Sequence, residues 1–89
     1  MTEPEIHTAA CACLRWVADW HEGVRPSCAL RLRRLTIVPL ALDDRLEVAI
    51  TDGAQVWQVL GSTDAKIMHL VSFSFLENRI RRLLTGEQL

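Results

Sequence analysis

The sequence predicts an α+β fold in which an N-terminal amphipathic helix precedes an antiparallel sheet of three to four strands and a C-terminal helix. Three observations lead to this prediction. Helical periodicity extends over residues 4–22, two-residue alternation flanks an Asp52-Gly53 dipeptide, and a helix-start motif lies at residues 74–77. Because 89 residues suffice for only one hydrophobic core, we expect residues 1–89 to form a single domain.

The first element is a helix expected from about Pro4 to Glu22. Thr2 and Glu5 have the spacing of a capping box, with a proline in the first turn, where its missing N–H costs nothing. Gly23 is suited to end the helix. At steps of about 100° per residue, the apolar side chains form one wide arc. The residues on this arc are Ile6, Ala9, Ala10, Cys13, Leu14, Trp16, Val17 and Trp20.

The second element is a strand expected to begin at Cys28, where apolar and polar residues start to alternate. The alternation shifts by one residue at Arg33-Arg34, which a β-bulge or a bend would accommodate. Pro39 is expected to end the strand and to favour an edge position, because proline cannot donate a hydrogen bond to a neighbouring strand.

A β-hairpin is expected around Asp52-Gly53, a dipeptide favoured in two-residue hairpin turns. Residues 45–51 alternate on one side of the turn, and a second strand follows it. This turn predicts a register that collects most of the apolar bulk on one face. The expected pairs are Ile50 with Gln55, Val48 with Trp57, and Leu46 with Val59.

The stretch from Lys66 to Leu84 allows two interpretations. Alternation over 66–73 favours a strand, followed by a helix from about Phe75 to Thr85 that Gly86 closes, and this gives the order αββββα. One long buried helix from Asp64 would instead give αβββα.

Composition excludes several classes of protein. A chain that is 49% hydrophobic with a net charge of -1 does not have the composition of a disordered protein. No apolar run approaches the roughly 18 residues that a membrane-spanning helix needs. The N-terminus is acidic and lacks the apolar region of a secretory signal, and three cysteines are an odd number for a disulfide framework. We therefore expect a cytoplasmic protein that does not enter a membrane.

The sheet is expected to have a second face that is only partly polar. If the first helix covers one face, apolar side chains project from the other: Val38, Val56, Leu60, Met68 and Leu70. An uncovered apolar face favours a partner, so we expect another protein or a second copy of the chain, as a homodimer, to bind there. The alternative is that the C-terminal helix covers this face and completes a monomeric core.

Two arginine clusters are further candidates for partner binding. They consist of Arg31, Arg33 and Arg34 in the first strand region and Arg79, Arg81 and Arg82 in the C-terminal helix. Guanidinium groups can bind the carboxylates of a protein or the phosphates of a nucleic acid, although ordinary solvated faces would have the same composition. Trp16 lies at the margin of the apolar arc, and an exposed tryptophan there would be an anchor for a partner.

The sequence contains no recognisable catalytic set or cofactor motif. His7 and Cys11 are four residues apart on the polar side of the first helix, but no further ligands can be placed to complete a metal site. His69, Asp43-Asp44 and Asp52 do not form a nucleophile, base and orienting group at a known spacing. We therefore expect no enzymatic activity, no cofactor and no metal.

Together, these features predict a small non-enzymatic interaction or regulatory module, such as an inhibitor, adaptor or accessory subunit from a bacterium or a phage. Its expected partner is another protein, bound by a homodimer. The alternative is a nucleic-acid-binding regulator that uses the clustered arginines to contact phosphates.

Overall fold

The computed structural model describes residues 4–61 and 73–86, and its elements follow the order αββββα. The four strands form one antiparallel sheet in the order β1-β2-β3-β4. The predicted fold class is confirmed. The elements are α1 (Pro4–His21), β1 (Leu30–Leu32), β2 (Leu35–Ala41), β3 (Leu46–Thr51), β4 (Val56–Leu60) and α3 (Phe73–Leu84).

Helix α1 matches its predicted bounds to within one residue and ends as expected. Gly23 adopts a positive φ of 87°, a conformation that glycine tolerates without steric cost. The Val24 N–H then donates to the carbonyl oxygen of Asp19 at 2.9 Å, which satisfies one of the last carbonyls of the helix.

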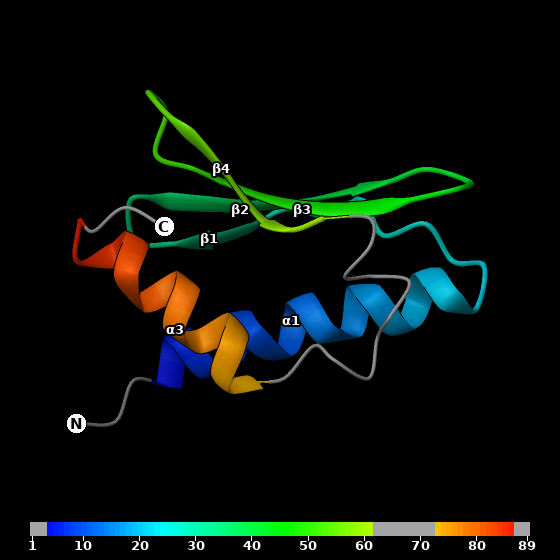
Figure 1. Ribbon diagram of the computed structural model, residues 1–89, viewed down its shortest axis with the longest axis horizontal. Helices are drawn as coiled ribbons and strands as arrows, with labels where there is room; N and C mark the ends of the chain where they lie inside the picture. The colour runs from blue at the N-terminus through cyan, green and yellow to red at the C-terminus, as the bar shows by residue number, and fades with distance from the viewer. Residues whose placement is uncertain (1–3, 62–72, 87–89) are drawn as a thin grey trace.

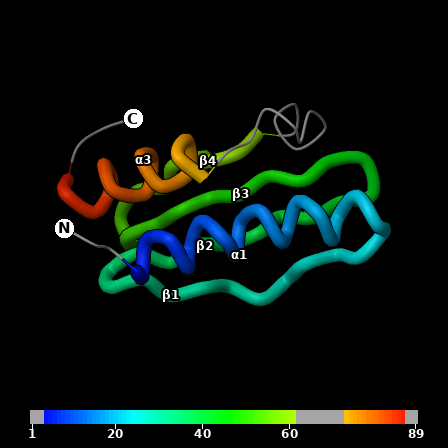
Figure 2. The backbone as a smooth tube through the Cα atoms, turned by 90° about the horizontal axis from the view of Figure 1, so that it is seen from below, coloured from blue at the N-terminus to red at the C-terminus, as the bar shows by residue number. Residues whose placement is uncertain are grey.

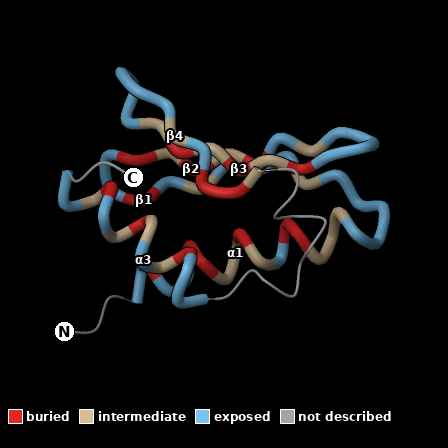
Figure 3. The backbone as a smooth tube through the Cα atoms, in the orientation of Figure 1, coloured by how far each residue is buried: buried red, intermediate tan, exposed pale blue. Residues whose placement is uncertain are grey.

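Both helices lie on the same side of the sheet (Figure 1). Seen from the helix side, α3 lies next to β4, while α1 lies over the other strands and runs roughly along them (Figure 2). Buried residues, red in Figure 3, come from all these elements and form one core between the helices and the sheet. Its largest fully buried members are Ile6, Val17, Leu35, Ile37, Leu46, Val48, Ile50, Val59, Leu60, Leu76, Ile80 and Leu83.

The segment predicted as one strand from Cys28 is a tight hairpin. Leu32 pairs with Leu35, so Arg33 and Arg34 form a two-residue turn between β1 and β2. The predicted bulge or bend at this dipeptide is therefore wrong. A turn explains the phase shift equally well, because it brings Leu32 and Leu35 to the same face of the sheet.

Pro39 lies inside β2 and does not end the strand, contrary to the prediction. The Leu42 N–H donates to the Arg45 carbonyl at 2.8 Å, so these two residues form a hydrogen-bonded pair. Such pairs recur at every second position of an antiparallel ladder, and Pro39 therefore falls in a non-hydrogen-bonded pair with Val48. Its nitrogen therefore points away from β3. The pairing of β1 with β2 ends at Leu30 and Ile37, so Pro39 occupies a local edge where no donor is needed.

The hairpin between β3 and β4 forms, but its turn lies one residue later than predicted. The Asp52 N–H donates to the Gln55 carbonyl at 3.3 Å, which makes Gly53-Ala54 the turn. Gly53 has a φ of 98°, as a two-residue turn with glycine in its first position requires. Ile50 consequently pairs with Trp57, and the three predicted pairs are wrong.

A register shift between Val48 and Ala49 changes the end of β4. Beyond this irregularity Val48 pairs with Leu60, and both Val59 and Leu60 are buried. The extra residue explains how two consecutive side chains of β4 reach the core, which regular alternation does not permit.

The strand predicted over 66–73 falls outside the described residues, except for Phe73, which is the first residue of α3. The C-terminal helix therefore begins two residues before its predicted start at Phe75. The alternative of one long helix from Asp64 also concerns residues outside the described ranges.

Candidate functional site

The face of the sheet opposite the helices is the candidate site, and we call it the outer face. Alternation along each strand assigns its residues, because the positions between them point into the core. It consists of Thr36, Val38, Leu40 and Leu42 from β2 and its end, Arg45, Glu47, Ala49 and Thr51 from β3 and its start, and Val56 and Gln58 from β4.

Apolar side chains on the outer face are open to solvent. Val56 is 72% exposed and Leu40 47% exposed, while Val38 and Ala49 are half-buried. No helix of the described residues lies on this side of the sheet (Figure 1). A contiguous apolar area of this kind is a feature of binding surfaces.

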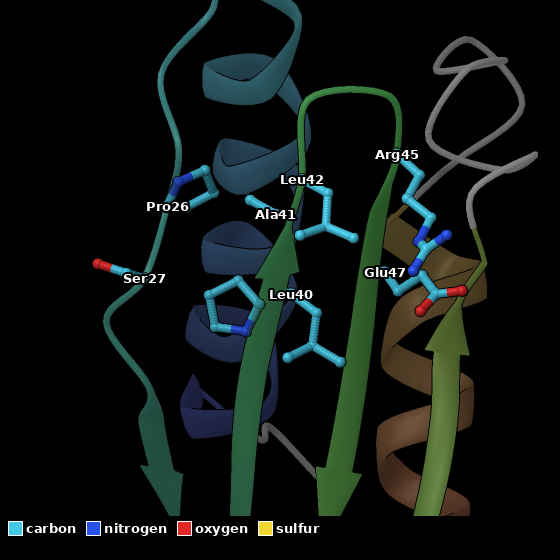
Figure 4. Close-up of a pocket in the computed structure, with 8 residues that line it drawn as sticks. Pro26, Ser27, Leu40, Ala41, Leu42, Arg45 and Glu47 are labelled. Carbon is cyan, nitrogen blue, oxygen red and sulfur yellow. The ribbon is translucent and has the colours of Figure 1, made fainter.

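A groove of about 420 Å³ opens at the end of the outer face (Figure 4). It lies where β1 no longer pairs with β2, so the chain before β1 runs past β2 without forming a strand ladder. The residues that line it are Pro26, Ser27, Pro39, Leu40, Ala41, Leu42, Arg45 and Glu47.

Two contacts fix the walls of this groove. The Arg25 guanidinium donates to the Asp43 carboxylate at 2.9 Å, which ties the segment before β1 to the turn between β2 and β3. The Trp20 indole N–H donates to the Leu42 carbonyl at 2.8 Å and holds the same hairpin against the end of α1. The groove is thus part of the folded structure and not only a gap between loops.

The groove carries two opposite charges on its outer rim. Arg45 and Glu47 occupy successive outward positions, and Figure 4 shows both side chains on the same side of the hairpin. The amide of Gln58 donates to Glu47 at 3.2 Å. The Arg45 guanidinium makes no hydrogen bond or ion pair within residues 4–61 and 73–86.

The residues predicted to project from the second face have different positions in the structure. Val38 and Val56 lie on the outer face. Leu60 is fully buried, and its predicted place on this face is wrong because the bulge in β4 turns it into the core. Met68 and Leu70 lie outside the described residues.

Trp16 is not available as an anchor for a partner. It is only 9% exposed and belongs to the core between α1 and the sheet. The conditional role of an exposed Trp16 as an anchor does not apply, because the apolar arc of α1 is wide enough to include Trp16 in the core.

The first arginine cluster is engaged in contacts within the chain. Arg31 donates to the Arg33 carbonyl at 2.8 Å, and Arg33 pairs with the Glu5 carboxylate of α1. Arg34 donates to the carbonyls of Leu83 and Leu84 at the end of α3. These contacts stabilise the β1–β2 turn and tie each of its three arginines to the fold.

The second arginine cluster lies along α3 and also has internal partners. Arg79 donates to the Gln58 carbonyl at 3.0 Å and lies over the Phe75 ring, with 5.2 Å between the guanidinium carbon and the ring centre. Arg81 donates to the side chain of Asn78 at 2.9 Å, and Arg82 lies one residue beyond it. The contact of Arg34 with the end of α3 brings the two clusters to the same end of the molecule.

Arg79 also modifies the free edge of β4. Gln58 falls in a non-hydrogen-bonded pair with Ala49, so its carbonyl points away from β3, toward the edge of the sheet. Because this carbonyl accepts a hydrogen bond from the Arg79 guanidinium, it is not available to accept one from a strand of another chain.

The imidazole and thiol groups are separated in the structure. The His7 ring stacks on Phe73, with 5.1 Å between the ring centres, and its Nδ1 lies 3.4 Å from the Glu77 carboxylate. Burial raises the pKa of the Cys13 thiol to about 12, whereas Cys11 is half-buried and Cys28 exposed. Within the described ranges, no three acidic, histidine or cysteine side chains form a group suited to a metal ion.

Sequence reasoning did not assign Leu40, Leu42, Arg45 and Glu47 to the site. The signal was present, because outward positions recur at 36, 38, 40 and 42 if the strand is continued through Pro39. A strand can contain a proline at a local edge. Extending the predicted strand past Pro39 would therefore have placed Leu40 and Leu42 on the outer face.

No family model, curated protein or solved structure matches this chain. Neither described helix is long and apolar enough to cross a membrane. The function is therefore argued from the geometry of the outer face.

Proposed function

We propose that this chain is a small non-enzymatic interaction module that binds a partner protein through its outer face. One observation carries the proposal: both helices cover the same side of the sheet, and apolar side chains such as Leu40 and Val56 remain exposed on the other side. Burying apolar surface contributes about 25 cal/mol for each Å² removed from water, so a partner that covers this face gains stability from it.

An interaction module of this size fits the role of an inhibitor, adaptor or accessory subunit. Binding through a sheet face requires no catalytic group and no cofactor. The three cysteines are all free, which fits a reducing compartment such as the cytoplasm.

Nucleic-acid binding has weaker support. Arg33, Arg34 and Arg79 each hold two parts of the fold together, so only part of each guanidinium group is available to a phosphate. Their removal would affect stability before it affected binding, so we do not base a function on them.

The experiment that tests the proposal compares two variants that place a lysine at similarly exposed apolar positions. Leu40→Lys places a charge on the outer face, where the residue is 47% exposed, and Val24→Lys does so at a residue that is 52% exposed in the connection after α1. Each tagged variant and the unmodified chain are used to capture proteins from a lysate of the source cells, with quantitative mass spectrometry as the readout.

We expect Leu40→Lys to lose at least one protein that Val24→Lys and the unmodified chain both retain, with the chain's own untagged copies counted among the captured proteins. The proposal is wrong if every captured protein binds Leu40→Lys as well as it binds the unmodified chain.

A further inference from the structure

We infer that the partner on the outer face is a second copy of this chain, docked so that Arg45 of each copy faces Glu47 of the other. This inference rests on the proposed use of the outer face and adds the identity of the occupant. It is carried by the charge pattern of the β2–β3 hairpin.

The outward positions of this hairpin combine apolar residues with one positive and one negative charge. Arg45 and Glu47 are neighbours on the same face, yet no ion pair joins them, and Arg45 has no partner within the described residues. The remaining outward residues of β2, β3 and β4 are uncharged, and all three strands are fully described. A surface with one charge of each sign can complement a copy of itself.

A single twofold rotation satisfies both charges. In a symmetric dimer, if residue 45 of one copy contacts residue 47 of the other, the reciprocal contact follows automatically. The required axis lies between the two sheets and crosses the strands at the level of the pair formed by Ala41 and Leu46. Arg45 and Glu47 lie on opposite sides of this level along β3.

The same rotation brings the two exposed leucines together. Leu40 pairs with Glu47 across the ladder, and the Leu42 N–H donates to the Arg45 carbonyl, so these leucines lie beside the two charges. The axis that exchanges positions 45 and 47 therefore also exchanges positions 40 and 42. Leu40 of one copy then faces Leu42 of the other, which places apolar contacts beside the two ion pairs.

The groove lies where a side chain of the second copy would enter. Its lining includes the apolar residues Pro26, Pro39, Leu40 and Ala41. In the docked arrangement Leu42 of the other copy projects toward Leu40. The apolar lining of the groove is suited to a leucine side chain.

The size of the hairpin predicts a weak dimer. Four outward positions per strand extend about 20 Å, and two strands with their side chains are about 10 Å wide. Such an area is well below the roughly 800 Å² that each partner contributes to a standard interface. We therefore expect an equilibrium between monomer and dimer that depends on protein concentration.

The test uses charge reversal, measured by sedimentation equilibrium over a series of concentrations at low ionic strength. Arg45→Glu alone places two carboxylates against each other at both symmetric contacts, and Glu47→Arg alone places two guanidinium groups there. We expect each single variant to dimerise at least tenfold more weakly than the unmodified chain, because every dimer contains the repulsive contact twice.

Recovery of dimerisation in two further samples distinguishes a loss of docking from a general loss of stability. A mixture of the Arg45→Glu and Glu47→Arg chains should form a one-to-one heterodimer with an affinity near that of the unmodified chain. The chain with both reversals should dimerise again with itself. Arg15→Glu, a reversal on the exposed side of α1, serves as the control and should not change the affinity.

Two outcomes would overturn this inference. If both single variants dimerise like the unmodified chain, any dimer uses other contacts. If the unmodified chain stays monomeric at all concentrations, the occupant is another molecule, such as an extended peptide on the free edge of β2. In either case the proposed function is judged separately, by whether Leu40→Lys loses a partner that Val24→Lys retains.

Discussion

The guanidinium of Arg34 donates to the carbonyl oxygens of Leu83 and Leu84, at 2.8 and 3.0 Å, and thereby links the β1–β2 turn to the C-terminus of α3. The last carbonyls of a helix have no partner within the helix and carry a partial negative charge. One cation therefore satisfies two of them and joins segments that are about 50 residues apart in the sequence.

Removing this link should destabilise the fold. We expect Arg34→Ala to lower the free energy of unfolding by about 1–2 kcal/mol, because it leaves two helix carbonyls without their charged donor. Arg34→Lys should recover only part of the loss, since an ammonium group does not have the planar fork that bridges two acceptors. Urea denaturation followed by circular dichroism measures the free energy of unfolding of both variants, with Arg15→Ala on the exposed side of α1 as the matched control. An equal loss in Arg34→Ala and Arg15→Ala would contradict this role.

The neighbouring residue Arg33 provides a second prediction, because it has a φ of 55° in the left-handed region. A residue branched at Cβ is disfavoured there, whereas glycine is tolerated. Arg33→Val should therefore lower the free energy of unfolding by about 1–2 kcal/mol. Arg33→Gly should stay within about 0.5 kcal/mol of the unmodified chain, because relief of strain offsets the loss of an exposed ion pair.

The same denaturation experiment checks this prediction, with Arg31→Val as the control at a regular strand position. In β1 a valine has favourable strand propensity, so Arg31→Val should cost less than Arg33→Val. If valine is tolerated equally at both positions, the conformation of Arg33 does not limit stability.

These two arginines also show why one hairpin escaped sequence-based prediction. The helix of α1 and the β3–β4 hairpin have local signals: a capping box, an amphipathic stripe and a Gly53 turn. The β1–β2 turn has no glycine, asparagine or aspartate. It is held by contacts with Glu5 of α1 and with the end of α3, which are distant in sequence. Contacts between residues that are distant in sequence produce no local sequence pattern from which the turn could be predicted.

The candidate site was predictable in kind but not in extent. Alternation placed Val38 and Val56 on a second face of the sheet, and the structure places both on the outer face. The groove depends on where β1 stops pairing with β2, which is a property of register and not of composition. The burial of Leu60 depends on a bulge, which alternation alone does not reveal.

A third prediction concerns Asp52 at the start of the Gly53-Ala54 turn. The backbone N–H groups of Gln55 and Ala54 donate to its carboxylate at 2.8 and 2.9 Å and lower its pKa below the ordinary value of 3.8. Asp52→Ala should lower the melting temperature at neutral pH, because two turn N–H groups lose their acceptor. Asp44→Ala, in the turn before β3, is the control and should have a smaller effect.

The pH dependence of that difference has a defined sign. The lowered pKa means that the Asp52 carboxylate stabilises the fold above pH 3.8, and that this contribution is lost as the pH falls through the folded-state pKa. The melting temperatures of the unmodified chain and Asp52→Ala should therefore converge at acidic pH. A constant difference between them down to pH 2 would show that the ionised carboxylate is not the stabilising form.

The buried thiol of Cys13 gives a fourth prediction, on stability at alkaline pH. Burial raises the pKa of this thiol from 9.0 to about 12, because the charged thiolate is disfavoured inside the core. The unfolded chain releases this proton above pH 9 while the folded chain retains it. The free energy of unfolding should therefore fall above pH 9, by up to about 1.4 kcal/mol per pH unit.

The chain is well suited to this measurement, since it contains no tyrosine and Lys66 is its single lysine. Denaturation midpoints are compared at pH 8 and 10 for the unmodified chain and for Cys13→Ala, which removes the buried thiol and should show a smaller decrease. In the native protein a thiol reagent should label exposed Cys28 rapidly, and Cys13 only as fast as the protein opens, because the thiolate is the reactive form. Cys28→Ala assigns the fast phase. Labelling of Cys13 at the rate of Cys28, or an unchanged decrease in Cys13→Ala, would mean that this thiol is not enclosed in the core.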